Sequence, residues 1–109
     1  MNSQSQAENW HRAANLSELE DREPFPVDIE GEEIAIVLLD GEVYAINNVC
    51  THEYACLSDG YVEEDRIVCQ LHLAEFHIPT GKVVEEPADG DLAVYPVKVE
   101  GDDIYVQIG

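Results

Sequence analysis

The chain has 109 residues, of which 45% are hydrophobic, and its formal net charge is −19 because 24 aspartates and glutamates outnumber 5 lysines and arginines. This length is typical of one domain, and we expect residues 1–109 to form a single one. The acidity argues against binding to nucleic acids or to anionic membranes, since both interactions require clustered basic side chains.

Short strands separated by turns are predicted in the first half of the chain. A short helix is expected first, at residues 16–20, with Asn15 as its N-cap and Glu18 completing a near capping box. Alternating apolar residues then predict strands near residues 25–30, 34–39 and 42–47. The Asp40-Gly41 pair between the last two predicts a type I′ hairpin turn, which requires positive φ at both positions.

A second group of strands is predicted after residue 66, at residues 66–69, 75–78, 82–84, 92–99 and 104–108. Eight or more short strands with almost no helix indicate an all-β fold, with antiparallel sheets in a sandwich or barrel-like stack. Residues 47–65 show no periodic apolar pattern. A long irregular segment in a small β domain is typical of a binding loop.

Two Cys-His pairs are the candidate metal ligands: Cys50 with His52 in CTH, and Cys69 with His72 in CQLH. Two thiolates and two imidazoles suit either a tetrahedral zinc ion or an iron-sulfur cluster with mixed ligation. The grouping of one Cys with one His favours the cluster, because zinc fingers usually group Cys with Cys and His with His. Cys56 has no such partner and is interpreted as a partly buried thiol.

Around these pairs the sequence resembles the Rieske 2Fe-2S family. The resemblance extends over roughly residues 10–108 and includes CTH at 50–52, LSDG at 57–60, CQLH at 69–72, Phe76, Thr80-Gly81 and Pro87-Ala88. It implies a Rieske fold with a cluster-binding subdomain of two loops at about residues 47–88. It also implies that Cys50 and Cys69 hold the buried iron, that His52 and His72 hold the outer iron, and that Pro87 lies in a third loop covering the cluster.

Departures from the family pattern carry further expectations. Gln70 and Leu73 stand where many members have Pro and Gly. Respiratory-chain members have an additional cysteine in each loop, and since Cys56 and Leu71 do not reproduce that pair, we expect no disulfide. Those members also have Ser and Tyr hydroxyls at the positions that correspond to Ala74 and Phe76. Without such hydrogen bonds the potential should lie near the low end of the roughly −150 to +300 mV Rieske range.

The resemblance is closest to the ferredoxin component of bacterial ring-hydroxylating dioxygenases, which implies a one-electron carrier that is not catalytic alone. Its partners would be a flavin-dependent NAD(P)H reductase and a terminal Rieske oxygenase. The oxygenase itself requires a further 2-His-1-carboxylate iron site, for which only His11 and His77 remain, and both are expected to be structural. The alternatives are a small subunit of an assimilatory nitrite reductase and a zinc-binding structural module.

The N-terminal residues and the acidic surface give the last expectations. Residues 1–10 contain neither a basic nor an apolar region, so we expect a soluble cytoplasmic monomer without a membrane segment. Most acidic side chains should form a solvated surface. A candidate docking rim for a basic partner comprises Glu53, Glu63, Glu64 and Asp65.

Overall fold

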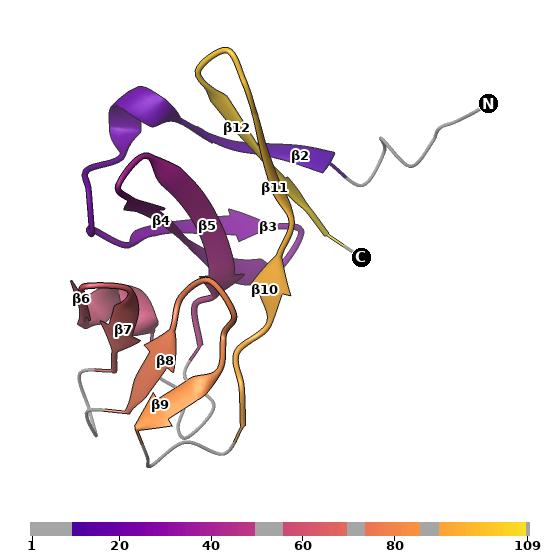
Figure 1. The fold of residues 1–109 in the computed structure, drawn as a ribbon. Coiled ribbons are helices and arrows are strands. Elements are labelled where there is room, and N and C mark those ends of the chain that lie inside the picture. Colours follow the sequence, from indigo (N-terminus) through magenta and orange to yellow (C-terminus); the bar gives the residue numbers. More distant parts are fainter. Residues whose placement is uncertain (1–9, 50–55, 70–73, 86–89, 109) are drawn as a thin grey trace.

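The computed structural model describes residues 10–49, 56–69, 74–85 and 90–108, and nearly all of their regular structure is strand (Figure 1). The strands are β2 (Trp10–Asn15), β3 (Phe25–Ile29), β4 (Glu32–Leu39), β5 (Glu42–Asn47), β6 (Tyr61–Glu63), β7 (Arg66–Val68), β8 (Glu75–His77), β9 (Val83–Glu85), β10 (Val94–Tyr95), β11 (Val97–Glu100) and β12 (Asp103–Gln107). Two single-turn 3-10 helices are η2 (Leu16–Glu18) and η3 (Leu57–Asp59). The predicted all-β fold is confirmed, and no helix in the described ranges is long and apolar enough to span a membrane.

The strands form three antiparallel sheets. The first has the order β10-β5-β4-β3, the second β11-β12-β2 and the third β6-β7-β8-β9. We call the first two sheets the base, and η3 with the third sheet the loop subdomain. Figure 1 shows the loop subdomain below the base, joined to it through the ends of β5 and β10.

Strand β4 is buried on both faces because the first sheet lies between two cores. Ile34 and Ile36 pack with the second sheet in one core, together with Ile104 and Val106. Ala35, Val37 and Leu39 point the other way, into a core shared with the loop subdomain. Successive side chains alternate across a strand, so the unbroken apolar run at residues 34–39 supplies both cores at once.

The predicted strands and turn of the first sheet are confirmed with small changes in their limits. Strands were expected near 25–30, 34–39 and 42–47, and β3, β4 and β5 occupy these places. Asp40 has φ 50° and Gly41 has φ 90°, as a type I′ turn requires. Glu30 and Gly31 form a second turn with positive φ, 52° and 87°, between β3 and β4.

The expected short helix is only one turn long. Its capping box is present: the Asn15 side chain accepts from the Ser17 N–H at 3.0 Å, and Glu18 Oε1 accepts from the Asn15 N–H at 2.8 Å. The helix ends at Glu18 rather than at residue 20 because Leu19 adopts an extended backbone and buries its side chain in the core of the base.

Two strand expectations were wrong. The segment expected as one strand at 92–99 is split at Pro96, so that β10 pairs with β5 in the first sheet and β11 pairs with β12 in the second. Proline has no N–H for a ladder hydrogen bond, which makes it a natural point for the chain to change sheets. Within the irregular segment expected at 47–65, Tyr61–Glu63 form β6, too short for a periodic pattern to be visible.

Candidate metal centre

Of the four predicted ligands, the structure describes only Cys69; Cys50, His52 and His72 lie outside the described residues. Cys69 directly follows β7 and is 1% exposed. Its neighbours in the shared core include Leu57 and Phe76 from the loop subdomain and Val37 from the base. The sulfur of this residue is therefore held where the two halves of the molecule pack together.

Backbone hydrogen bonds join the two ends of the second ligand loop. The Cys69 N–H donates to the Ala74 carbonyl oxygen at 2.7 Å, and Val68 pairs with Glu75 at the adjacent end of β7 and β8. These backbone bonds fix the points at which the CQLH segment leaves and rejoins the sheet. Gln70, Leu71 and Leu73 lie outside the described residues.

The two ends of the first ligand loop are also joined, mainly through hydrogen bonds of Asn48. Val49 and Cys56 form an isolated antiparallel bridge, and the Leu57 N–H donates to the Asn48 carbonyl oxygen at 2.7 Å. The Asn48 side chain, in a residue only 3% exposed, accepts from the Ser58 N–H at 2.7 Å and donates to Ser58 Oγ at 3.0 Å. Glu33 accepts from the Asn48 N–H through its carbonyl oxygen, at 2.8 Å, which ties the loop to β4.

The sequence reasoning missed Asn48 as a functional residue. Two sequence features could have pointed to Asn48: it lies two residues before Cys50, and its partner Ser58 lies in the LSDG segment. A buried asparagine needs partners for both ends of its amide, and Ser58 supplies them through its backbone and its hydroxyl.

Cys56 has the role expected of it, a partly buried thiol beside the first loop. Its Sγ donates to Glu33 Oε1 at 3.6 Å, and burial, followed by the charge of Glu33, raises the pKa of the thiol. Cys56 and Cys69 are both free of disulfides in the described part of the chain. The expected absence of a disulfide involving Cys50 remains a prediction.

Gly81 holds the turn between β8 and β9 against the chain that returns to the base. Its carbonyl accepts from the Leu92 N–H at 2.7 Å, and its N–H donates to the His77 carbonyl oxygen at 2.6 Å. Its φ is +77°, and a Cβ at this position would overlap the Leu92 carbonyl oxygen. Glycine is therefore required here by both backbone conformation and space. Pro87 and Ala88 lie outside the described residues.

The two remaining histidines contact side chains within the fold, and His77 bonds locally to Thr80, as predicted. His77 places Nε2 at 3.0 Å from Asp65 Oδ2 and Nδ1 at 2.8 Å from Thr80 Oγ1, linking two turns of the loop subdomain. His11 Nδ1 lies 4.0 Å from Glu30 Oε2 on the base. Across residues 10–49, 56–69, 74–85 and 90–108, no group of three or more His, Cys, Asp or Glu side chains could hold a metal ion.

Three residues of the expected acidic docking rim lie away from Cys69, and the rim itself stays a prediction. Glu63 ends β6, and Glu64 and Asp65 form the β6–β7 turn, which joins β7 at the end opposite Cys69. They make contacts within the molecule: Glu63 and Glu64 each lie 3.9 Å from Arg66, and Asp65 contacts His77. These three side chains therefore do not lie beside the second ligand loop, and Glu53 lies outside the described residues.

The described part of the site fits the donor set of a Rieske cluster, in which two cysteines and two histidines share the two irons. Cys69 is buried, free of disulfides and placed at the start of a loop whose two ends are joined by a backbone hydrogen bond. Ala74 and Phe76, fully buried in the same core, present no hydroxyl there. The surroundings of Cys69 are therefore apolar on the described side.

Comparison with known proteins decides between a cluster and a zinc ion. The sequence model of the Rieske [2Fe-2S] domain family matches residues 9–96 of this chain. The chain belongs to the Rieske family. Its cofactor is accordingly a Rieske-type 2Fe-2S cluster, and the zinc alternative has no support.

The ferredoxin component of a naphthalene 1,2-dioxygenase system from Pseudomonas aeruginosa is 37% identical to this Rieske protein over 101 residues, which cover 93% of this chain and 97% of the relative. Among solved structures, the ferredoxin of carbazole 1,9a-dioxygenase from Nocardioides aromaticivorans has a TM-score of 0.88 at 32% identity, covering 93% of this chain and 99% of that one. A chain in the complex of reduced oxygenase and oxidized ferredoxin of carbazole 1,9a-dioxygenase has a TM-score of 0.86 at 28% identity, covering 91% and 93%.

Two other structures represent the rival functions. Dicamba monooxygenase has a TM-score of 0.82 at 29% identity, but the match spans 92% of this Rieske protein and only 33% of the monooxygenase. A protein described as an NADH-dependent nitrite reductase small subunit from Mycobacterium tuberculosis has a TM-score of 0.82 at 24% identity, covering 92% and 95%. The second likeness shows the fold alone.

Proposed function

We propose that this Rieske protein is the ferredoxin of a multicomponent ring-hydroxylating dioxygenase system. It takes one electron at a time from an NAD(P)H-dependent flavin reductase and passes it to a terminal oxygenase. The observation that carries this proposal is the length of the matches: ferredoxins are matched over 97% and 99% of their own length, whereas an oxygenase is matched over only 33%. The region shared with an oxygenase is thus the size of its Rieske part alone.

The ligands proposed for the cluster are Cys50, His52, Cys69 and His72. When bound, a Rieske cluster accepts and releases single electrons. Cys69 would supply a thiolate from the buried side, where the shared apolar core excludes water. The backbone hydrogen bonds of Asn48 and Ala74, which join the ends of the two ligand loops, would keep the four ligands in place as the charge of the site changes.

The protein would act as a carrier rather than as a catalyst. Substrate oxidation in these systems belongs to the oxygenase, which needs a second iron site, and the relatives matched over nearly their whole length are ferredoxins. We infer a single domain over residues 1–109, a monomeric state and a cytoplasmic location. The net charge of −19 supports a partner with a basic surface and disfavours nucleic acids and membranes.

Reconstitution tests this function directly. The purified, iron-loaded protein should take up one electron per chain in an anaerobic dithionite titration and then show a rhombic EPR signal. Product formation by the reductase and terminal oxygenase of the same organism should require its addition. A colourless, zinc-containing protein, or product formation that is equally fast without it, would contradict the proposal.

A further inference from the structure

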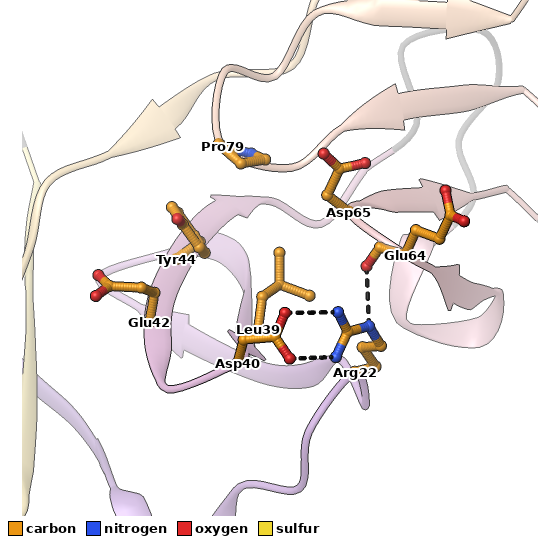
Figure 2. Close-up of a pocket in the computed structure, with 8 residues that line it drawn as sticks. All are labelled: Arg22, Leu39, Asp40, Glu42, Tyr44, Glu64, Asp65 and Pro79. Carbon is orange, nitrogen blue, oxygen red and sulfur yellow. Dashed lines mark hydrogen bonds and ion pairs between the residues drawn. The ribbon is translucent and has the colours of Figure 1, made fainter.

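A cleft of about 460 Å³ lies between the base and the loop subdomain, at the end of β7 remote from Cys69 (Figure 2). The turn between β4 and β5 forms one side, with Leu39, Asp40 and Tyr44. The β6–β7 turn and Pro79 form the other. Glu64 and Asp65 of the β6–β7 turn face this open space, whereas Val62 and Ile67 on either side of the turn pack in the core shared with the base.

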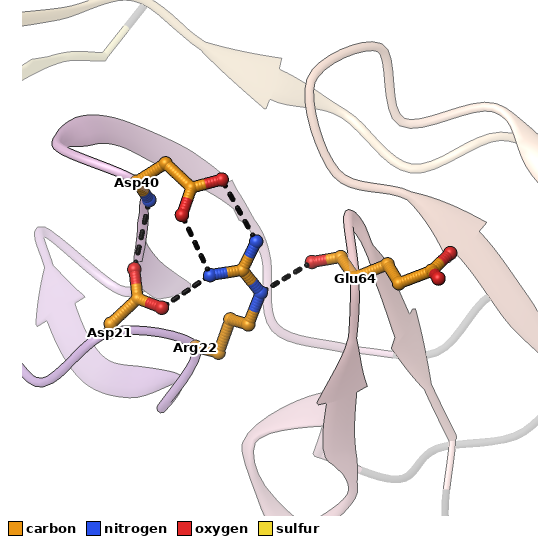
Figure 3. Close-up of polar contacts among 4 residues, drawn as sticks. All are labelled: Asp21, Arg22, Asp40 and Glu64. Atoms are coloured by element: carbon orange, nitrogen blue, oxygen red, sulfur yellow. Dashed lines mark hydrogen bonds and ion pairs between the residues drawn. The ribbon is translucent and has the colours of Figure 1, made fainter.

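Arg22 crosses the cleft on one side. Its Nη1 and Nη2 donate to the two carboxylate oxygens of Asp40 at 3.1 and 3.0 Å, and Nη1 also contacts Asp21 (Figure 3). Its Nε donates to the Glu64 carbonyl oxygen at 3.1 Å. One guanidinium therefore joins the base to the loop subdomain.

The backbone around Arg22 fixes this side chain to the base. The Arg22 N–H donates to the Leu38 carbonyl oxygen at 2.8 Å, and the Asp40 N–H donates to Asp21 Oδ1 at 2.8 Å. The hydrogen bonds from Arg22 also lower the pKa of the Asp40 carboxyl below its ordinary value. The planar fork of the guanidinium matches a carboxylate in two bonds, which gives the contact a defined direction.

On the other side of the contact, Glu64 begins the path to the cluster loop. Arg22 and Glu64 both have positive φ, 62° and 58°, a conformation that non-glycine residues adopt only where the surroundings determine it. After the turn, β7 runs for three residues and ends at Val68, directly before Cys69. Among the described residues, Arg22 makes the one side-chain hydrogen bond between the base and the β6–β7 hairpin.

We propose that Arg22 is a positioning residue for Cys69: by anchoring the Glu64 carbonyl to the base, it sets the position of β7 and therefore of the cysteine at its far end. This inference rests on the proposed function, because it takes Cys69 as a cluster ligand. None of the contacts of Arg22 with described residues involves Cys69. Its effect is transmitted along the short, paired strand β7, whose two neighbours β6 and β8 must move with it.

The test compares Arg22→Ala with Arg12→Ala in the cluster-loaded protein. Arg12 is the matched control because its Nε also donates to a carboxylate, Asp103 Oδ1 at 3.0 Å, but it lies on β2 in the second sheet. Arg22→Ala should accelerate loss of the cluster to a chelator about tenfold, alter the EPR g values and the reduction potential, and speed amide exchange in β7. Arg22→Lys should restore these properties in part. Equal EPR spectra and loss rates for Arg22→Ala and Arg12→Ala would overturn the proposal.

Two further variants separate the possible causes. Arg22→Ala combined with Asp40→Asn removes one charge of each sign, so a change that persists in it arises from position, whereas a return to wild-type values would show a purely electrostatic effect and contradict the proposal. If Arg22→Ala yields no folded protein, Arg22→Lys alone must show the same changes in smaller measure. Cys69→Ser tests the proposed function separately: if it retains the cluster, the ligand set is wrong, although faster β7 exchange in Arg22→Ala would still show the anchor.

Discussion

The N–H of Cys69 donates to the carbonyl oxygen of Ala74 at 2.7 Å, so the first residue of CQLH is bonded to the residue that begins the return to β8. Both residues are buried in the core shared by the base and the loop subdomain. The methyl group of Ala74 belongs to the same core as the proposed ligand, and a hydroxyl could replace one of its hydrogens with little change in volume.

Ala74→Ser should raise the reduction potential. A hydroxyl that bonds to a cluster sulfur stabilises the added electron, and a hydrogen bond worth about 1 kcal/mol corresponds to roughly 40 mV for one electron. Spectroelectrochemical titration measures the change. Ala45→Ser is the control, since Ala45 is equally buried but lies in the other core. The prediction is wrong if both variants leave the potential unchanged.

Gly81→Ala should destabilise the protein by about 3 kcal/mol, because a Cβ would meet the Leu92 carbonyl oxygen and the φ of +77° would be strained. Gly41→Ala is the control: Gly41 also has positive φ, but nothing lies within 4 Å of its added Cβ, so the cost should be only about 1 kcal/mol. Chemical denaturation of both variants measures the difference. Equal losses would show that the contact with Leu92 is unimportant.

Added salt should stabilise the folded protein and slow electron transfer from the reductase to it. The chain has only 5 lysines and arginines for 24 acidic residues. Four of these cations already pair with carboxylates in the same chain, within 4.0 Å: Arg12, Arg22, Arg66 and Lys98. Most carboxylates therefore have no cation to neutralise them. Screening relieves the remaining repulsion, and the melting temperature should rise by about 5 °C between 0.1 and 2 M KCl. Over the same range, attraction to a basic reductase should weaken.

Two measurements check the opposite effects of salt. Calorimetry follows the melting temperature, and stopped-flow absorbance follows reduction by the reductase. Glu53→Lys should lower the association rate without changing the cluster spectrum if Glu53 lies at the docking surface. A melting temperature that falls with salt would contradict the first part, and a reduction rate that is independent of salt would contradict the second.

Local features of the fold could be predicted from the sequence because a few adjacent residues determine them. The Asp40-Gly41 turn, the Asn15 capping box and the strand at 42–47 are examples. The change of sheet at Pro96 could not, since the apolar pattern continues through it.

The candidate site shows the same limit. Spacing predicts Cys69 as a ligand and separates it from Cys56. The contacts of Asn48 with Ser58 and of Arg22 with Glu64 join residues 10 and 42 positions apart in sequence, which no local pattern reveals. The distance of Glu63 from Cys69 could not be predicted either, because it depends on the β6–β7 turn, which reverses the chain before β7 leads to Cys69.

The ligand set is tested most directly by the iron and acid-labile sulfide content of five single variants. Cys50→Ser, His52→Ala, Cys69→Ser and His72→Ala should each lose the cluster and its rhombic EPR signal. Cys56→Ser should retain both at the wild-type level, because its thiol donates to Glu33 and burial raises its pKa. Loss of the cluster in Cys56→Ser together with its retention in Cys50→Ser would contradict the account.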